Sequence, residues 1–271
     1  MTGAHSHEEI ETELTSFRAF IPTTIERIAD LMVRMNAVEA RLETPAPTPA
    51  PIPASDVTIW KAGSAPIAGV LGRHALPDRI TKVEGGYQYE VRPTDGEVSG
   101  PGGRRAEEFG YHKWREGDEV SIVLKGLQFP RGWNLAHPVA AWAIHVQAAE
   151  YGSPHFQLKS LPGIGGGPLL QLVVEDGDRN FQPQWTEGLE MDFAYDIGLN
   201  IRWSQGSTGF LGATINGWEA GRYSGPTLSD TSEAYLKWGA YCGGGAARKV
   251  IIQDVRWAPG LGRIKELRAL P

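Results

Sequence analysis

The chain carries two different hydrophobic patterns, and the change between them falls near residue 55. From Ile10 to Leu42, apolar residues recur at alternating intervals of three and four, with Glu and Arg between them. Nine of the ten positions in this seam are apolar: Ile10, Leu14, Phe17, Ile21, Ile28, Leu31, Met35, Val38 and Leu42. A seam of this period predicts a helical coiled coil, and hence a homo-oligomer formed through residues 10–42. The residue types along the seam leave a dimer and a trimer both open.

Prolines limit this helical segment, one within it at Pro22 and a series after it from residue 45. Pro22 removes a backbone donor, so the helix either kinks there or begins at Pro22 and runs to about Glu43. A single amphipathic helix packed on the body is the alternative to a coiled coil. Proline then occupies every second position from 45 to 53, which predicts a stiff polyproline spacer. We therefore expect a helical segment at 1–43, a linker at 44–55 and a folded body at 56–271.

The body consists of short apolar stretches separated by Gly, Pro, Asn and Asp, with no long helical periodicity between them. Seven stretches have the length and the β-branched or aromatic content of strands: 87–91, 119–124, 142–147, 169–174, 199–203, 209–215 and 250–257. Asn216-Gly217 follows one of them and favours a two-residue hairpin turn. Many strands without alternating helices predict an all-β body, either a sandwich or a jelly roll.

Alternate residues of a strand face opposite sides of its sheet, so each strand divides into a core row and a solvent row. In the strand at 142–147, the apolar row is Trp142, Ile144 and Val146, which leaves His145 and Gln147 on the other face. In the stretch 235–241 the apolar row is Leu236, Trp238 and Ala240, and the other row is Tyr235, Lys237, Gly239 and Tyr241. A face that combines amide, cationic and aromatic side chains suits a polyhydroxylated ligand.

Composition and charge narrow the class of protein. The 34 Gly and 19 Pro among 271 residues favour a β-rich chain, and the nine Trp supply a large core. No apolar run reaches the ~18 residues of a membrane span, and we expect neither membrane insertion nor a secretion signal. The net charge of −6 argues against a nucleic-acid partner. Cys242 is the only cysteine, which excludes an intramolecular disulfide and a multi-cysteine metal site; we expect no metal and no cofactor.

Several motifs occur in the order found in one enzyme family. They are residues 87–95, the R-x-E motif at 105–107, residues 142–147 with Gly152-Ser153-Pro154, residues 201–204, Thr208-Gly209, Asn216-Gly217 and the Y-x-K-x-G-x-Y motif at 235–241. Together they resemble the jelly-roll polysaccharide lyases over about residues 80–257. The resemblance implies a concanavalin-like sandwich and β-elimination at a uronic acid.

The resemblance also implies roles for particular residues. Arg105 takes the place of the family's R-x-E arginine, Gln147 that of the amide which neutralises the substrate carboxylate, and Tyr235 that of the catalytic tyrosine; Lys237 and Tyr241 lie beside it. The family histidine, which removes the C5 proton, is replaced by Ala149, and Cys242 replaces a basic residue after the last motif tyrosine. His145 is the candidate substitute base. The carbohydrate-binding set is then Arg105, Gln147, Tyr235, Lys237 and Tyr241.

The oligomerising helix, the stiff spacer and the absence of a secretion signal together favour a phage virion protein, a minor tail or head-surface decoration component. In this interpretation the jelly roll binds a polysaccharide or cell-envelope glycan multivalently, and the helix attaches it to other virion proteins on the virion surface or tail. Two alternatives remain open. One is an active lyase that depolymerises an acidic glycan, and the other is a decoration or scaffold protein without a ligand.

Overall fold

The structure, a computed structural model, describes residues 53–96, 104–131, 141–148, 154–162, 167–175, 181–228, 233–242 and 248–271. Within these ranges the chain forms sixteen strands, a short 3-10 turn η1 (Ala54–Asp56) and one α-helix, α2 (Ile264–Ala269). The predicted coiled coil and most of the predicted linker lie outside the described residues. No helix in the described part of the chain is long and apolar enough to cross a membrane.

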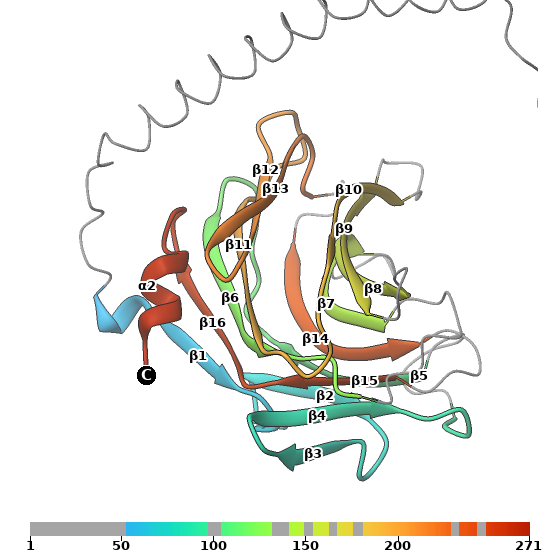
Figure 1. The fold of residues 1–271 in the computed structure, drawn as a ribbon. Coiled ribbons are helices and arrows are strands. Elements are labelled where there is room, and N and C mark those ends of the chain that lie inside the picture. The colour runs from blue at the N-terminus through green and yellow to red at the C-terminus, as the bar shows by residue number, and fades with distance from the viewer. Residues whose placement is uncertain are drawn as a thin grey trace, which may run out of the picture. The chain divides into compact units, whose positions relative to one another are not determined.

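Two large sheets pack face to face and form a β-sandwich (Figure 1). The six-stranded sheet has the order β1 (Thr58–Lys61), β16 (Asp254–Pro259), β6 (Glu119–Leu127), β11 (Tyr195–Arg202), β12 (Phe210–Ile215) and β13 (Trp218–Ser224). The seven-stranded sheet has the order β10 (Phe181–Gly188), β9 (Pro168–Glu175), β8 (Pro154–Pro162), β7 (Ala141–Ala148), β14 (Ala234–Cys242), β5 (Arg104–Gly110) and β2 (Leu71–Ala75). Every strand pairing among the described residues is antiparallel. The predicted all-β sandwich is thus confirmed for the body.

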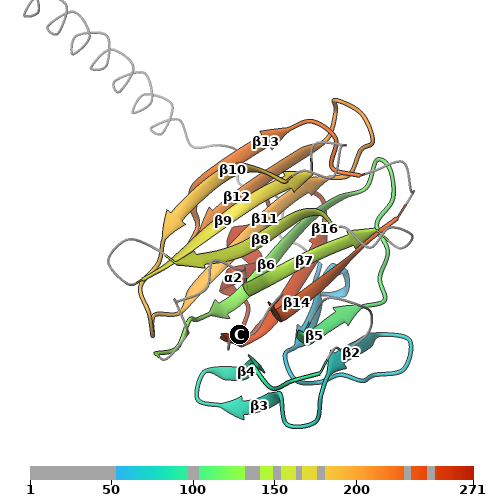
Figure 2. The same ribbon diagram turned by 90° about the vertical axis from the view of Figure 1, so that its right-hand side faces the viewer.

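A third, three-stranded sheet lies at one end of the sandwich (Figure 2) and has the order β15 (Arg248–Ile252), β4 (Gly86–Val91) and β3 (Ile80–Val83). It corrects one prediction, because the stretch 250–257 is two strands. β15 pairs with β4, whereas β16 pairs with β6 in the six-stranded sheet. The chain changes sheets at Gln253, whose backbone N–H donates to the Lys125 carbonyl at 3.0 Å. The stretch 250–257 has strand-like residues on both sides of Gln253, and this pattern does not show that the strand partner changes there.

The space between the two large sheets is filled by aromatic and aliphatic side chains. Trp60 stacks on Trp238 with ring centroids 5.5 Å apart, and Trp203 stacks on both Trp114 and Phe156. Helix α2 packs on the outer face of the six-stranded sheet through Ile264 and Leu267 (Figure 1). Helix α2 therefore covers the part of this outer face formed by β6, β11 and β16.

The hairpin between β12 and β13 forms as its sequence predicts. Ile215 pairs with Trp218 across a two-residue turn, in which Asn216 and Gly217 have φ angles of 52° and 88°. Positive φ at both positions is the geometry that Asn-Gly adopts at low cost. A side chain at position 217 would also collide with the Arg268 guanidinium, which lies 2.3 Å from the place of a Cβ atom. The turn therefore suits Asn-Gly, and Gly217 lies beside the Arg268 guanidinium of α2.

Candidate active site on the seven-stranded sheet

The candidate site lies on the outer face of the seven-stranded sheet, where β14 and β5 run side by side. Leu236, Trp238 and Ala240 of β14 belong to the buried core, so the alternate residues occupy the opposite face. That face carries Tyr235, Lys237, Gly239 and Tyr241, as the sequence predicts. The expectation that this row is solvated is wrong for Lys237, whose relative exposure is 2%.

Strand β5 brings the R-x-E motif next to this row. Arg105 pairs with Tyr241, and Glu107 pairs with Gly239. The Arg105 guanidinium lies over the Tyr241 ring, 4.9 Å from its centroid, and Arg105 Nη1 is 3.8 Å from Glu107 Oε2. The predicted residues Arg105, Tyr235, Lys237 and Tyr241 therefore share one face of two adjacent strands.

Gly239 permits the close approach of these two strands. Its φ is 128°, and a Cβ atom there would lie 2.3 Å from the Ala106 carbonyl oxygen. Because backbone, and not a flexible side chain, occupies that space, a larger residue would push β14 away from β5. The glycine of the Y-x-K-x-G-x-Y motif thus sets the spacing between Arg105 and the row of β14.

Two buried ionisable residues, Lys237 and Glu107, lie on this face. Burial lowers the pKa of Lys237, Glu107 raises it again, and Arg105 lowers it further. Glu107 itself is 1% exposed. A lysine whose cation is disfavoured by burial and by a neighbouring arginine gains stability when a further negative charge arrives. The electrostatics of the face therefore favour an anionic ligand.

Tyr235 is the residue best suited to carry a proton here. Burial raises the pKa of Tyr235 to about 12, Glu107 raises it too, and Arg105 opposes them. The ring meets Phe109 edge-on at 6.1 Å, and the ammonium groups of Lys113 and Lys237 lie 4.9 and 5.6 Å from its centroid. At neutral pH the phenol keeps its proton, so it is a donor and not a base.

For His145 and Gln147 the structure describes the backbone of β7. Gln147 pairs with Tyr235, and His145 pairs with Lys237 on one side and with Gln157 of β8 on the other. His145 and Tyr235 are therefore diagonal neighbours, a relation that places Cα atoms about 7–8 Å apart. Ala149, the place of the family histidine, lies outside the described residues.

Three polar residues of this face were missed by sequence reasoning. His74 of β2 pairs with Glu107, and its pKa is lowered by burial and by Lys237, with a smaller effect from Arg105, while Glu107 opposes the shift. Gln157 of β8 is 3% exposed, and its buried Oε1 accepts no hydrogen bond within the described structure. Lys113 follows β5 and reaches the Tyr235 ring. The alternation rule would have found Gln157 had β8 been recognised as a strand.

The described residues also bear on metal binding. Across the ranges that the structure describes, no group of three His, Cys, Asp or Glu side chains is arranged to hold a metal ion. Besides the single carboxylate of Glu107 and the imidazole of His74, the polar groups of the face are cations, an amide and phenols, which bind hydroxyl and carboxylate groups directly.

Comparison with known proteins identifies the fold. The sequence matches no protein-family model and no curated protein. Among solved structures, an endo-β-1,4-glucuronan lyase from the fungus Trichoderma reesei is similar with a TM-score of 0.54 and 12% identity, over 75% of this chain and 95% of that one. A family 7 alginate lyase, A1-II′, in complex with product has a TM-score of 0.53 and 11% identity, and the match covers 71% of this chain and 96% of that one. The alginate lyase PA1167 from Pseudomonas aeruginosa has a TM-score of 0.50 and 13% identity, and the match covers 72% of this chain and 100% of that one. The body therefore has the jelly-roll fold of polysaccharide lyases.

Proposed function

We propose that the sandwich is a polysaccharide lyase that cleaves a uronate-containing glycan by β-elimination. The observation that carries the proposal is the convergence on one face of Arg105, the buried Lys237 and the proton-bearing Tyr235. The solved structures with similar folds are described as glucuronan and alginate lyases, both of which act on uronate polymers. This support favours the lyase alternative over the virion-binding interpretation, which depends on residues 10–42 and stays a prediction.

In the proposed reaction, cations act on the substrate carboxylate first. The partly exposed Arg105 binds the carboxylate at C5, and Lys237 behind it adds positive charge from a buried position. Neutralising the carboxylate acidifies the proton on C5 and stabilises the carbanion-like transition state. Glu107 is a positioning residue, because it lies beside Arg105 and its charge raises the pKa of Lys237 against the effect of burial.

The elimination then moves one proton away from C5 and supplies another to the leaving oxygen. A base takes the C5 proton, the electrons of that C–H bond form the C4–C5 double bond, and the C4–O bond breaks. Tyr235, protonated at neutral pH, donates to the departing glycosidic oxygen. His145 is the proposed base, since its backbone position is diagonal to Tyr235 and opposite Lys237.

The test is an ultraviolet assay for the new C4–C5 double bond over a panel of uronate polymers, including polymannuronate, polyguluronate and glucuronan. We expect turnover of at least one polymer by the full chain. Tyr235→Phe should lower the rate by about 10³-fold, because it removes the proton donor but keeps the ring. His145→Ala should cause a similar loss if His145 is the base.

Tyr223→Phe on β13 is the matched control, since it deletes a phenol from an edge strand of the other sheet. It should leave the rate within about twofold of the wild type. A flat absorbance trace over the whole panel overturns the proposal, and so does undiminished activity of Tyr235→Phe. Binding without turnover would point to a glycan-binding module.

A further inference from the structure

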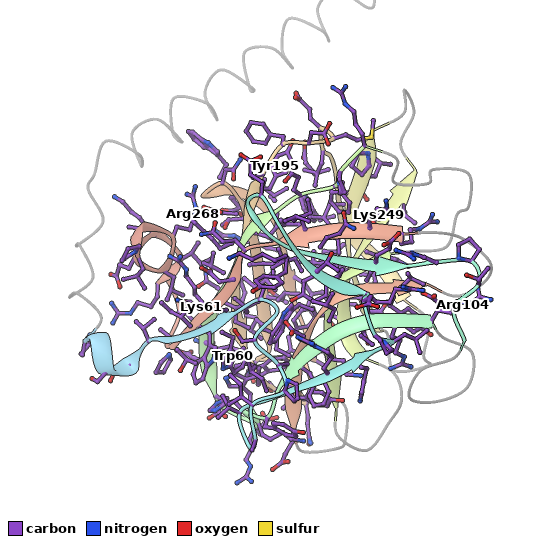
Figure 3. All side chains as sticks on the ribbon, turned by 90° about the horizontal axis from the view of Figure 1, so that it is seen from below. Trp60, Lys61, Arg104, Tyr195, Lys249 and Arg268 are labelled. Carbon is purple, nitrogen blue, oxygen red and sulfur yellow. The ribbon has the colours of Figure 1, made fainter. Side chains whose placement is uncertain are left out.

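A pocket lies at the edge of the sandwich that is opposite to the proposed active-site face. It has a volume of about 300 Å³ and is formed by the end of β10, the start of β11 and the β12–β13 hairpin. β10 and β13, the edge strands of the two large sheets, approach each other there (Figure 2), and a Cβ atom at Gly221 would lie 2.8 Å from Trp185 Cβ. In Figure 3, Tyr195 of this pocket and Arg104, next to the R-x-E arginine, lie far apart.

The most conspicuous residue of the pocket is Trp218, whose side chain is 81% exposed. Tryptophan in a sandwich core is ordinarily buried, as Trp203 and Trp238 are here. Trp218 directly follows the Asn216-Gly217 turn, whose positive φ angles suit these two residues. The two-residue hairpin places the indole at the pocket, where its exposed surface is available to a ligand.

Polar groups around the indole supply both donors and acceptors. The Tyr195 hydroxyl accepts the Glu190 N–H at 2.8 Å and retains its own proton for donation. Asn216 Oδ1 accepts the Asp196 N–H, and the NH₂ group of the same amide is a donor. Glu187 and Glu219 line the same pocket and are exposed acceptors, Glu219 also being paired with Arg222. Such a set can bond several hydroxyl groups of one ligand.

The charge of the lining selects among carbohydrates. Two carboxylates and no lysine or arginine belong to it. Arg222, next to the lining, pairs with Glu219, whereas a uronate would bring its negative charge close to the exposed Glu187 carboxylate, which electrostatic repulsion disfavours. A neutral sugar stacks its apolar face on the indole and donates hydroxyl hydrogens to the carboxylates.

We propose that this pocket binds a neutral sugar unit of a polysaccharide, with Trp218 as the stacking platform. The domain then holds two carbohydrate sites of opposite electrostatic preference, a cationic face for uronate and an acidic pocket for neutral sugar. A glycan that carries both kinds of unit, or a wall polymer lying beside the uronate substrate, would engage both sites. The pocket does not depend on the proposed catalysis, because none of its residues belongs to the active-site face.

The experiment is isothermal titration calorimetry of the full chain with three neutral hexasaccharides, namely cellohexaose, mannohexaose and maltohexaose, and with a hexamer of guluronate. We expect at least one neutral ligand to bind. Trp218→Ala should weaken that binding by about tenfold or more, and Trp218→Phe, which keeps a ring, by only about threefold. Glu187→Gln should weaken it by about threefold, because a charged acceptor becomes neutral.

Two controls separate this site from the active-site face. Added salt should leave neutral-sugar binding nearly unchanged and should weaken guluronate binding. Trp218→Ala should leave guluronate binding and lyase turnover unchanged. The proposal is overturned if no neutral hexasaccharide binds or if Trp218→Ala binds it as the wild type does. Sedimentation that shows a dimer lost in Trp218→Ala would also overturn it, since the surface would then be a chain–chain contact.

Discussion

Glu107 and Glu108 are consecutive residues of β5, and both are buried. Their side chains point to opposite faces of the sheet and have different partners. Glu108 lies on the core side. Its carboxylate accepts the backbone N–H groups of Gly63 and Ala65 at 2.8 and 3.2 Å, Arg73 Nη2 at 2.7 Å and the Tyr89 hydroxyl at 2.5 Å. The same Tyr89 oxygen accepts the Trp238 indole N–H at 3.1 Å, so the cluster also anchors β14.

Glu107 lies on the outer face and is surrounded by groups that titrate. Arg105 is within 3.8 Å, and the charge of Glu107 raises the pKa values of Lys237, Tyr235 and His74. Burial is thus the same for the two carboxylates, whereas their partners differ. Saturation by fixed hydrogen-bond donors marks Glu108 as structural, and the ring of cations and proton carriers marks Glu107 as part of the proposed site.

The largest expected effect is on the free energy of unfolding, which should fall more when Glu108 is substituted than when Glu107 is. Glu108→Gln places an NH₂ group against the N–H donors of Gly63, Ala65 and Arg73, and should lower the free energy of unfolding by about 3 kcal/mol. Glu107→Gln keeps a polar side chain of the same shape beside Arg105 and should cost about 1 kcal/mol. Urea unfolding followed by tryptophan fluorescence measures both. Equal losses for the two variants would remove the distinction.

The next effect is on the pH profile of the proposed activity. Because Glu107 raises the pKa values of both Lys237 and Tyr235, Glu107→Gln should move the alkaline limb of the rate–pH curve to lower pH. We expect a loss of about tenfold in rate at neutral pH. A purely structural residue would lower the rate equally at every pH, so an unshifted profile contradicts this role for Glu107.

The smallest expected effect is the contribution of His74 to the pH dependence of the free energy of unfolding. Its pKa is lowered from 6.5 in the folded chain, chiefly by burial, so below pH 6.5 the unfolded chain takes up a proton that the folded chain resists. Stability should therefore fall as the pH drops below 6.5, and it should be level with respect to this group above that pH. In His74→Gln the dependence should be flatter between pH 7 and 5. Identical urea midpoints against pH for the two proteins would exclude a buried neutral His74.

Much of the secondary structure of the body could be predicted from sequence, because strand composition, turn residues and side-chain alternation are local patterns. The strand at 87–91, the Asn216-Gly217 turn and the alternation of β14 depend on neighbours within a few residues, and all three are found. The alternation rule also placed Tyr235, Lys237 and Tyr241 on one face. The family resemblance assigned Arg105 to the same site, and the structure shows that it lies on the adjacent strand β5.

What escaped prediction depends on contacts distant in sequence. β2 reads Leu-Gly-Arg-His-Ala, too short and polar to be recognised as a strand, so His74 was missed. The burial of Lys237 and the difference between Glu107 and Glu108 depend on which strands lie against β5. The division at Gln253 depends on a change of sheet. Each of these is a tertiary property that no single stretch of sequence contains.

The central claim is that the cationic face performs elimination on a uronate polymer, and the mass of the products tests it most directly. The full chain would be incubated with polyguluronate, polymannuronate or glucuronan, and the oligosaccharides would be weighed by mass spectrometry. Elimination adds no water, so each cleavage should leave one product with an unsaturated end that is lighter by one water molecule than a hydrolytic product. If every product has the full hydrolytic mass and none is lighter by one water molecule, or if the polymers stay intact throughout, the account is contradicted.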